Sequence, residues 1–305
     1  MPAIVDKGKT LGQVFTPKWV ADLIVYWAIR SKDDRVLDPA AGTGVFIEAA
    51  LDRLHQLGSS NPGPQVVAIE LDKKLAKYLS DKYEGLGVKV LTGDFFSYSP
   101  RYGLHVIHNG SVLSFFDAVV GNPPYIERQL MLNYKYLKNM FPDIPSLADI
   151  YVYFVIHGST FLKSFGRLGF IISDSWLTAN YGTYLKKFLL EKLKLKYVIY
   201  FDKRVFEKRL VSSTIILAEK RLTSTEDIIF IRVKNIDENV IEILKEIICK
   251  GIEKKFTDIN DHLIITKVPA KHISAHEQWL PYVLGLKYYL RLKTHSLLVP
   301  LERIA

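Results

Sequence analysis

The apolar positions of this 305-residue chain form short continuous runs, separated by longer segments with a helical period. Seven short runs predict β-strands: Arg35–Leu37, Gln65–Ile69, Val88–Leu91, Phe116–Val120, Leu168–Ile172, Tyr197–Phe201 and Thr214–Leu217. Four longer segments predict helices: Val45–Leu57, Asp72–Tyr83, Ile150–Leu162 and Tyr184–Leu193. Strands that alternate with helices in this way predict an α/β fold, with a parallel sheet covered on both faces.

The pattern changes towards the end of the chain. Ile228–Val233 predicts one more strand and Val240–Ile252 another helix, and from about Ile259 the period becomes unclear. We therefore expect one α/β domain over residues 1–260 and a separate tail over residues 261–305.

A glycine-containing loop follows the first predicted strand and opens the first predicted helix. It runs from Asp38 to Gly44 and includes Pro39 and Ala40. Gly42 and Gly44 allow the backbone to turn sharply and a ligand to approach it closely. A loop at this place in an α/β sheet is typical of nucleotide-cofactor sites.

Carboxylates also end the next two predicted strands. Glu70 can accept hydrogen bonds from both hydroxyls of a ribose, and Asp94 can accept one from an adenine amino group. The adenine ring would stack on Leu71 or Phe95. Glu70 alone could instead cap the next helix, and Asp94 could belong to a simple turn. Together with the loop at Gly42, however, these residues favour a nucleoside cofactor.

The charge of the loop distinguishes between cofactors. Dinucleotide-binding loops usually carry a third glycine, where this chain has Ile47. Asp38 would repel a pyrophosphate, whereas it would stabilise the cationic amino group or sulfonium of S-adenosyl-L-methionine. The sequence therefore predicts S-adenosyl-L-methionine rather than NAD.

A tetrapeptide with catalytic potential, Asn122-Pro123-Pro124-Tyr125, follows the fourth predicted strand, which would deliver it beside the cofactor. An exocyclic amine is a poor nucleophile because its lone pair is delocalised into the ring. The Asn122 side-chain oxygen and the Pro123 carbonyl can accept its two N–H groups and direct the lone pair at a methyl group. Tyr125 offers a face on which a flipped base could stack. We expect these four residues to be catalytic.

With these motifs in this order, the chain resembles the gamma-class adenine-N6 DNA methyltransferases of type II restriction-modification systems. The likeness covers roughly residues 10–220, and Gln13-Val14-Phe15-Thr16-Pro17 resembles the N-terminal motif of that family. The resemblance implies a Rossmann-like, seven-stranded methyltransferase sheet, mostly parallel with one antiparallel strand. It also implies methyl transfer to the N6 amino group of adenine in double-stranded DNA after base flipping, which would protect a restriction site.

The resemblance assigns further site residues. Gln13, Phe15, Thr16 and Pro17 would contact the methionine part of the cofactor, and Phe206 would pack against the extruded adenine opposite Tyr125. Thr16 and Pro17 could also start a helix, with Thr16 as its N-cap. Phe206 could equally anchor a solvated basic loop.

Two aromatic residues after the fifth predicted strand leave two interpretations open. Trp176 and Tyr181 could line the site or pack in the core.

Other functions remain compatible with the tetrapeptide. It occurs in enzymes that methylate a glutamine amide in release factors and in some guanine-N2 RNA methyltransferases. A non-catalytic subunit that binds cofactor or DNA is a further alternative. The short distance between Met1 and the first motif favours the DNA enzyme.

Composition narrows the class of partner. The formal charge of +9 favours a polyanion such as nucleic acid. The single cysteine, Cys249, excludes an intramolecular disulfide and a cysteine-based zinc site, and the scattered histidines predict no metal site. Because the first residues are polar and no apolar run could span a bilayer, we expect a cytoplasmic protein without membrane association.

The tail bears on how a target would be chosen. Members of the family normally carry a target-recognition domain after the catalytic one, and Leu298–Ala305 resembles the beginning of such a domain. We therefore expect residues 261–305 to be a linker and the truncated start of that domain. Recognition would then come from a separate domain or subunit, and cleavage from a cognate endonuclease.

Overall fold

The computed structural model describes residues 16–100, 107–108, 111–112, 115–124, 135–202, 212–221, 226–252, 256–259, 262–286 and 289. The predictions made for Gln13, Phe15, Tyr125 and Phe206 lie outside these residues.

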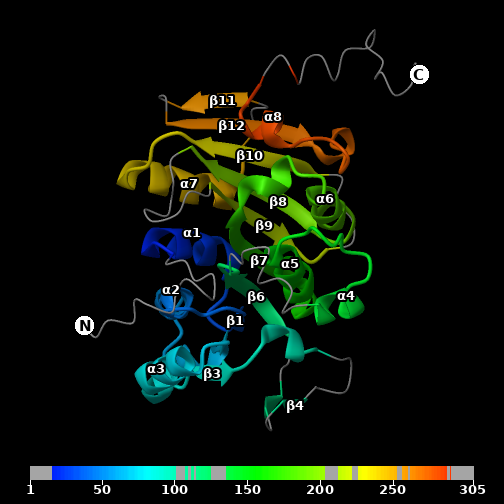
Figure 1. The fold of residues 1–305 in the computed structure, drawn as a ribbon. Coiled ribbons are helices and arrows are strands. Elements are labelled where there is room, and N and C mark those ends of the chain that lie inside the picture. The colour runs from blue at the N-terminus through cyan, green and yellow to red at the C-terminus, as the bar shows by residue number, and fades with distance from the viewer. Residues whose placement is uncertain are drawn as a thin grey trace.

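One large sheet runs through the molecule (Figure 1). Its strands are β1 (Val36–Asp38), β2 (Val66–Glu70), β3 (Lys89–Thr92), β6 (Phe116–Gly121), β7 (Leu162–Ser173), β8 (Lys194–Phe201), β9 (Ser213–Glu219), β10 (Asp227–Val233), β11 (Phe256–Ile259) and β12 (Leu263–Pro269). A separate small hairpin is formed by β4 (Ile107–His108) and β5 (Ser111–Val112). The helices are α1 (Lys18–Ala28), α2 (Val45–Gln56), α3 (Lys73–Tyr83), α4 (Tyr136–Met140), α5 (Ile150–Thr160), α6 (Gly182–Glu191), α7 (Glu238–Lys250) and α8 (Leu280–Val283).

The seven strands predicted up to Leu217 are confirmed, in the order β3-β2-β1-β6-β7-β9-β8. They are parallel except for β9, which runs against both of its neighbours. Beyond β8 the sheet continues with β10, β12 and β11, so the described part of the sheet has ten strands rather than seven. The expectation of a single antiparallel strand is also wrong, because β12 runs against β10 and β11.

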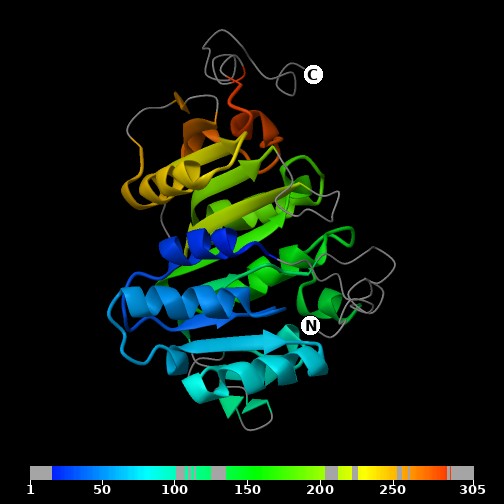
Figure 2. The ribbon, with the colours of Figure 1, turned by 90° about the vertical axis from the view of Figure 1, so that its left-hand side faces the viewer.

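Helices cover both faces of the sheet, as predicted. Figure 1 shows α7, α1 and α2 on one side of the sheet and α6, α5 and α4 on the other. Figure 2 views the molecule from the side of α7, α1 and α2. Two separate clusters of buried apolar residues fill the two interfaces. Strands that are covered on both sides have few polar positions, which is why they appear in the sequence as continuous apolar runs.

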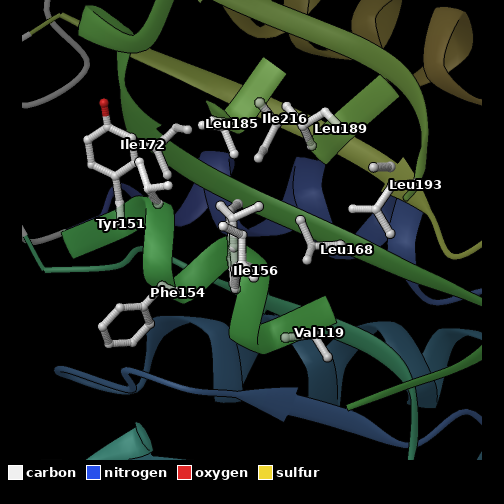
Figure 3. Close-up of a cluster of buried hydrophobic side chains, with 14 of the residues drawn as sticks. Val119, Tyr151, Phe154, Ile156, Leu168, Ile172, Leu185, Leu189, Leu193 and Ile216 are labelled. Atoms are coloured by element: carbon white, nitrogen blue, oxygen red, sulfur yellow. The ribbon is translucent and has the colours of Figure 1, made fainter. Parts of the chain in front are cut away.

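Helix α5 is the centre of one of these clusters. Every residue from Ile150 to Ser159 is buried, as expected for a helix that is apolar on most of its surface. Figure 3 shows that Ile156 of α5, Val119 and Leu168 of the sheet, and Leu185 and Leu189 of α6 lie in one cluster on the same face of the sheet. This packing fixes the N-terminal end of α5 beside the ends of β6 and β7.

The sheet and its core extend past residue 260, where we expected the catalytic domain to end. All seven residues of β12 pair with β10, and Trp279, Tyr282 and Val283 are fully buried in the same core as α5. Residues 263–283 are therefore integrated into the α/β unit. Among the described residues, no helix has the length and apolar character needed to cross a membrane.

Candidate functional site

A cleft opens at the carboxyl ends of β1, β2, β3 and β6. The empty space in it, including the solvent at its open mouth, is about 690 Å³. The cleft is lined by Pro39, Ala40, Gly42, Glu70, Leu71, Gly93, Asp94, Phe95, Phe96, Asn122, Pro124, Ile150 and Phe154. Most of the residues predicted from the three strand ends and the tetrapeptide therefore meet in one place.

The glycine loop has the backbone conformation that its glycines permit. Gly42 and Gly44 both have a positive φ, of 54° and 88°, which side-chain-bearing residues rarely adopt. A Cβ atom on Gly44 would also lie 2.8 Å from the Leu79 side chain. Gly44 thus lets the start of α2 pack closely against Leu79 of α3. The loop around Gly42 lines the cleft.

Glu70 braces this loop from the end of β2. One carboxylate oxygen accepts a hydrogen bond from the Gly42 N–H and the other from the Asp72 N–H, both at 2.8 Å. Burial raises the pKa of the Glu70 carboxyl above its usual value, against the lowering effect of these bonds. Glu70 does not cap α3, because Asp72 does so by accepting from the N–H groups of Lys74 and Leu75.

Asp38 directly precedes the lining residues Pro39 and Ala40 but is itself buried and not among the residues that line the cleft. It is 1% exposed, and its Oδ1 accepts a hydrogen bond from the Ala40 N–H at 3.1 Å. Its buried Oδ2 accepts no hydrogen bond from any described residue. Burial raises the pKa of Asp38 to about 8, and the negative charge of Glu70 adds to the rise. A buried carboxylate oxygen of this kind is satisfied best by a cationic partner.

The end of β3 supplies Asp94 and the two residues proposed for stacking. Asp94 caps the turn Phe95–Ser97 by accepting a hydrogen bond from the Phe96 N–H. Leu71 is 45% exposed and presents its side chain to the cleft. The Phe95 ring is only 2% exposed and stacks on Phe154 with centroids 5.3 Å apart. Of the two alternatives, Leu71 therefore has the accessible apolar surface.

His157 was not singled out from the sequence, yet it holds this turn. Its Nε2 lies 2.8 Å from the Tyr98 carbonyl oxygen, and its ring packs edge-on against Phe95. Burial lowers the pKa of His157 to about 4, so the ring is neutral at physiological pH. A single apolar-face histidine in a helix gives no signal in the sequence that would separate this role from simple core packing.

Asn122 also lines the cleft, and a hydrogen bond holds its side chain. Its Nδ2 donates a hydrogen bond to the Thr16 hydroxyl at 3.0 Å, across 106 positions of sequence. The alternative that Thr16 caps α1 is wrong, because the N-cap residue is Pro17 and no side chain caps that helix. Pro124 lines the cleft, whereas Pro123 is buried beside it.

Gly121 allows the close approach of β6 to the loop. A Cβ atom there would lie 3.1 Å from Asp38 Oδ1 and 3.4 Å from Pro39. The residue that precedes Asn122 therefore brings the tetrapeptide directly against the start of the glycine loop.

The two open assignments after β7 have different outcomes. Trp176 is fully buried, donates a hydrogen bond to the Thr214 hydroxyl and packs against Trp279, so it belongs to the core. Tyr181 is half-buried and joins a polar network near the start of α5, in which its hydroxyl donates to Asp149 and contacts Ser175 and Tyr151.

The chain is similar to a known protein family and to several known proteins. Residues 105–206, which include β6 and the tetrapeptide, match the Eco57I restriction-modification methylase family. The type II methyltransferase M.BstVI of Geobacillus stearothermophilus is 30% identical over 290 residues. The type II methyltransferase M.HincII of Haemophilus influenzae is 28% identical over 254 residues. Over residues 105–206 the chain is thus similar to the Eco57I restriction-modification methylase family.

These relatives are matched over only part of their length. The matches cover 85% and 78% of the chain but only 48% of M.BstVI and 41% of M.HincII. The chain thus spans about half the length of the curated relatives that it matches.

Solved structures show the same fold at low sequence identity. The methyltransferase subunit of a type I restriction-modification system from Streptococcus thermophilus matches with a TM-score of 0.65 at 19% identity, over 90% of this chain and 60% of that one. A class I S-adenosylmethionine-dependent methyltransferase from Listeria monocytogenes matches with a TM-score of 0.60 at 17% identity, over 78% and 72% of the two chains. The predicted methyltransferase fold class is confirmed.

Proposed function

We propose that this protein transfers a methyl group from S-adenosyl-L-methionine to the N6 amino group of adenine in double-stranded DNA. The observation that carries the proposal is the position of Asn122, which is held by a hydrogen bond to Thr16 and lines the same cleft as Glu70 and Asp94. The cleft thus brings together groups suited to a nucleoside cofactor and a group suited to an amine. Similarity to restriction-modification methylases supports DNA as the substrate.

The cleft residues fit the cofactor. Glu70, with both oxygens already oriented by backbone N–H groups, has further lone pairs for the ribose hydroxyls. Leu71 offers an apolar surface for the adenine, and Asp94 an acceptor for its amino group. Asp38 places a buried, raised-pKa carboxyl where a cationic group would satisfy Oδ2. When bound, S-adenosyl-L-methionine supplies an electrophilic methyl group.

The tetrapeptide then orients the amine. The hydrogen bond from Asn122 Nδ2 to the Thr16 hydroxyl fixes the orientation of the amide. Oδ1 is then the group of this side chain that can accept a hydrogen bond from the substrate. Oδ1 and the Pro123 carbonyl take the two N–H groups of the adenine amine and point its lone pair towards the methyl carbon. No strong base is required before transfer, because the N6–methyl bond would form as the sulfur–methyl bond breaks, and the methylated amine would lose its extra proton to water only afterwards. Positioning therefore supplies most of the catalysis.

Adenine inside a duplex cannot reach this cleft, so the base has to be flipped out of the stack. We propose that Tyr125 and Phe206 hold the flipped base, as the family resemblance implies. The formal net charge of +9 favours contacts between the chain and the phosphate backbone of DNA.

Target choice and partners complete the proposal. The chain spans about half the length of its relatives. We therefore propose that sequence recognition comes from a separate domain or subunit. The methylation would protect a site from a cognate endonuclease. A type IIG restriction endonuclease, BpuSI, contains a region of the same fold, matched with a TM-score of 0.65.

A transfer assay tests the proposal. The unaltered chain is incubated with S-adenosyl-L-methionine that carries a tritiated methyl group and with a pool of duplex DNA of random sequence, and label in DNA is counted. We expect label in DNA, and none with Asn122→Ala. Label in added RNA or protein but not in DNA would contradict the proposed substrate.

A further inference from the structure

The Asp94 carboxylate is held at both oxygens by donors from two different elements. Oδ1 accepts a hydrogen bond from the Phe96 N–H at 3.0 Å, within its own turn. Oδ2 accepts a hydrogen bond from the hydroxyl of Tyr136, which stands on α4, 42 positions further along the chain. The rotation of this carboxylate is therefore set partly by α4.

Tyr136 binds the carboxylate from outside the cleft. Asp94 is among the residues that line the cleft, whereas Tyr136 is not, and the Tyr136 side chain is 37% exposed to solvent. The hydroxyl therefore reaches Oδ2 without filling the space that a ligand would take. A carboxylate oxygen has two lone pairs, so Oδ2 can accept a second hydrogen bond from the cleft side.

Helix α4 does not depend on this hydroxyl for its position. Leu137, the next residue, is 1% exposed and lies in the core around α5. Phe141, directly after the helix, packs edge-on against Phe96 at 6.2 Å and against His157 at 5.8 Å. The Tyr136 ring is thus presented to Asp94 by packing, and the hydroxyl can be removed without removing the support of the helix.

We propose that Tyr136 is a positioning residue for adenine recognition. Its hydroxyl fixes the Asp94 carboxylate in the orientation in which Oδ2 accepts the amino group of the cofactor's adenine. This inference rests on the proposed function, because that adenine belongs to S-adenosyl-L-methionine. It assigns to α4 a role in cofactor selection, since only a ligand with an amino group at this position gains from the fixed acceptor.

Two ligands that differ only at this group provide the test. S-adenosyl-L-homocysteine carries the amino group, and S-inosyl-L-homocysteine carries a carbonyl oxygen in its place. Their dissociation constants are measured by calorimetry with the full chain and with Tyr136→Phe. We expect the variant to bind the adenosyl ligand about three- to tenfold more weakly, an effect equal to that of one ordinary hydrogen bond, and the inosyl ligand unchanged.

The control is Tyr78→Phe, which removes the hydroxyl of an exposed tyrosine on α3 and should change neither constant. Equal weakening of both ligands by Tyr136→Phe would indicate a merely structural role and overturn the inference. Unchanged or tighter binding of the adenosyl ligand would overturn it as well. If the unaltered chain binds neither ligand, the proposed cofactor fails, and the inference fails with it.

Discussion

The side-chain amide of Asn122 donates a hydrogen bond to the hydroxyl of Thr16 at 3.0 Å, although 106 positions separate the two residues. This bond joins the segment before α1 to the end of β6. It also fixes the orientation of the amide, with Nδ2 towards Thr16. Two motifs that are far apart in the sequence therefore form one structural unit at the cleft.

Substitution of either partner should separate catalysis from cofactor binding. Asn122→Ala removes the acceptor for the substrate amine, and we expect kcat to fall about a hundred- to a thousandfold, comparable to loss of a key transition-state hydrogen bond. Thr16→Val removes only the support of the amide, and a fall of about tenfold is expected. Single-turnover methylation and calorimetry with S-adenosyl-L-methionine measure the two effects.

Thr178→Val is the matched control, since its hydroxyl is exposed on the surface. It should leave kcat unchanged. An Asn122→Ala variant that still turned over at the original rate would remove the amide from the mechanism.

Cofactor affinity should depend on pH through Asp38. With a pKa of about 8, the buried carboxyl is mostly protonated at neutral pH in the free protein. A cationic group binds only the ionised form, so binding releases a proton and affinity should rise about tenfold per pH unit as the pH approaches 8 from below, then level off. Calorimetry at pH 6 to 9 measures this slope.

The Asp38→Asn variant cannot ionise at this position. It should bind more weakly above pH 8 and lose this part of the pH dependence. A slope that is identical in the variant would assign the proton to another group.

Gly44 should be indispensable for the loop, because both its φ of 88° and the nearby Leu79 side chain oppose a Cβ atom. We expect Gly44→Ala to lower the free energy of unfolding by about 1–3 kcal/mol. Gly85→Ala is the control, since a Cβ atom there would contact nothing within 4 Å. Urea unfolding compares the two, and equal stability of both variants would contradict the argument.

Lys186 should anchor residues 274–285 to the α/β unit. This lysine is 2% exposed, and its ammonium donates hydrogen bonds to the carbonyls of Leu177 and Glu277. Lys186→Met leaves both carbonyls without that donor, and a loss of about 2–4 kcal/mol of unfolding free energy is expected. Hydrogen exchange should rise first at the amides around Trp279.

The neighbouring Lys187→Met provides the comparison, because Lys187 is exposed on the same helix. Slow exchange around Trp279 in the Lys186→Met variant would show that packing alone holds this segment.

The central sheet could be predicted from the sequence because its strands are buried on both faces. Apolar runs such as Phe116–Val120 have no other stable location in a soluble α/β protein. β12 could not be predicted in the same way, since Thr266 and Lys267 interrupt its apolar pattern and its partner β10 lies far away in the sequence. The extension of the sheet past residue 260 follows from that pairing.

The placement of the candidate site residues was predictable where residue type and strand end coincide, as for Glu70, Asp94 and Asn122. The direction of a side chain was not, because it depends on tertiary packing. Phe95 follows Asp94 in the expected place, yet its ring belongs to the core with Phe154. Tyr136 had no signal at all, since α4 has only five residues and no motif marks it.

The most direct test of the central claim is the identity of the methylated nucleoside. Duplex DNA is treated with the chain and S-adenosyl-L-methionine, digested to nucleosides and analysed by mass spectrometry, with Asn122→Ala in parallel. The account predicts N6-methyladenine with the unaltered chain and none with the variant. Methylated cytosine instead, or equal amounts of N6-methyladenine with both proteins, would contradict it.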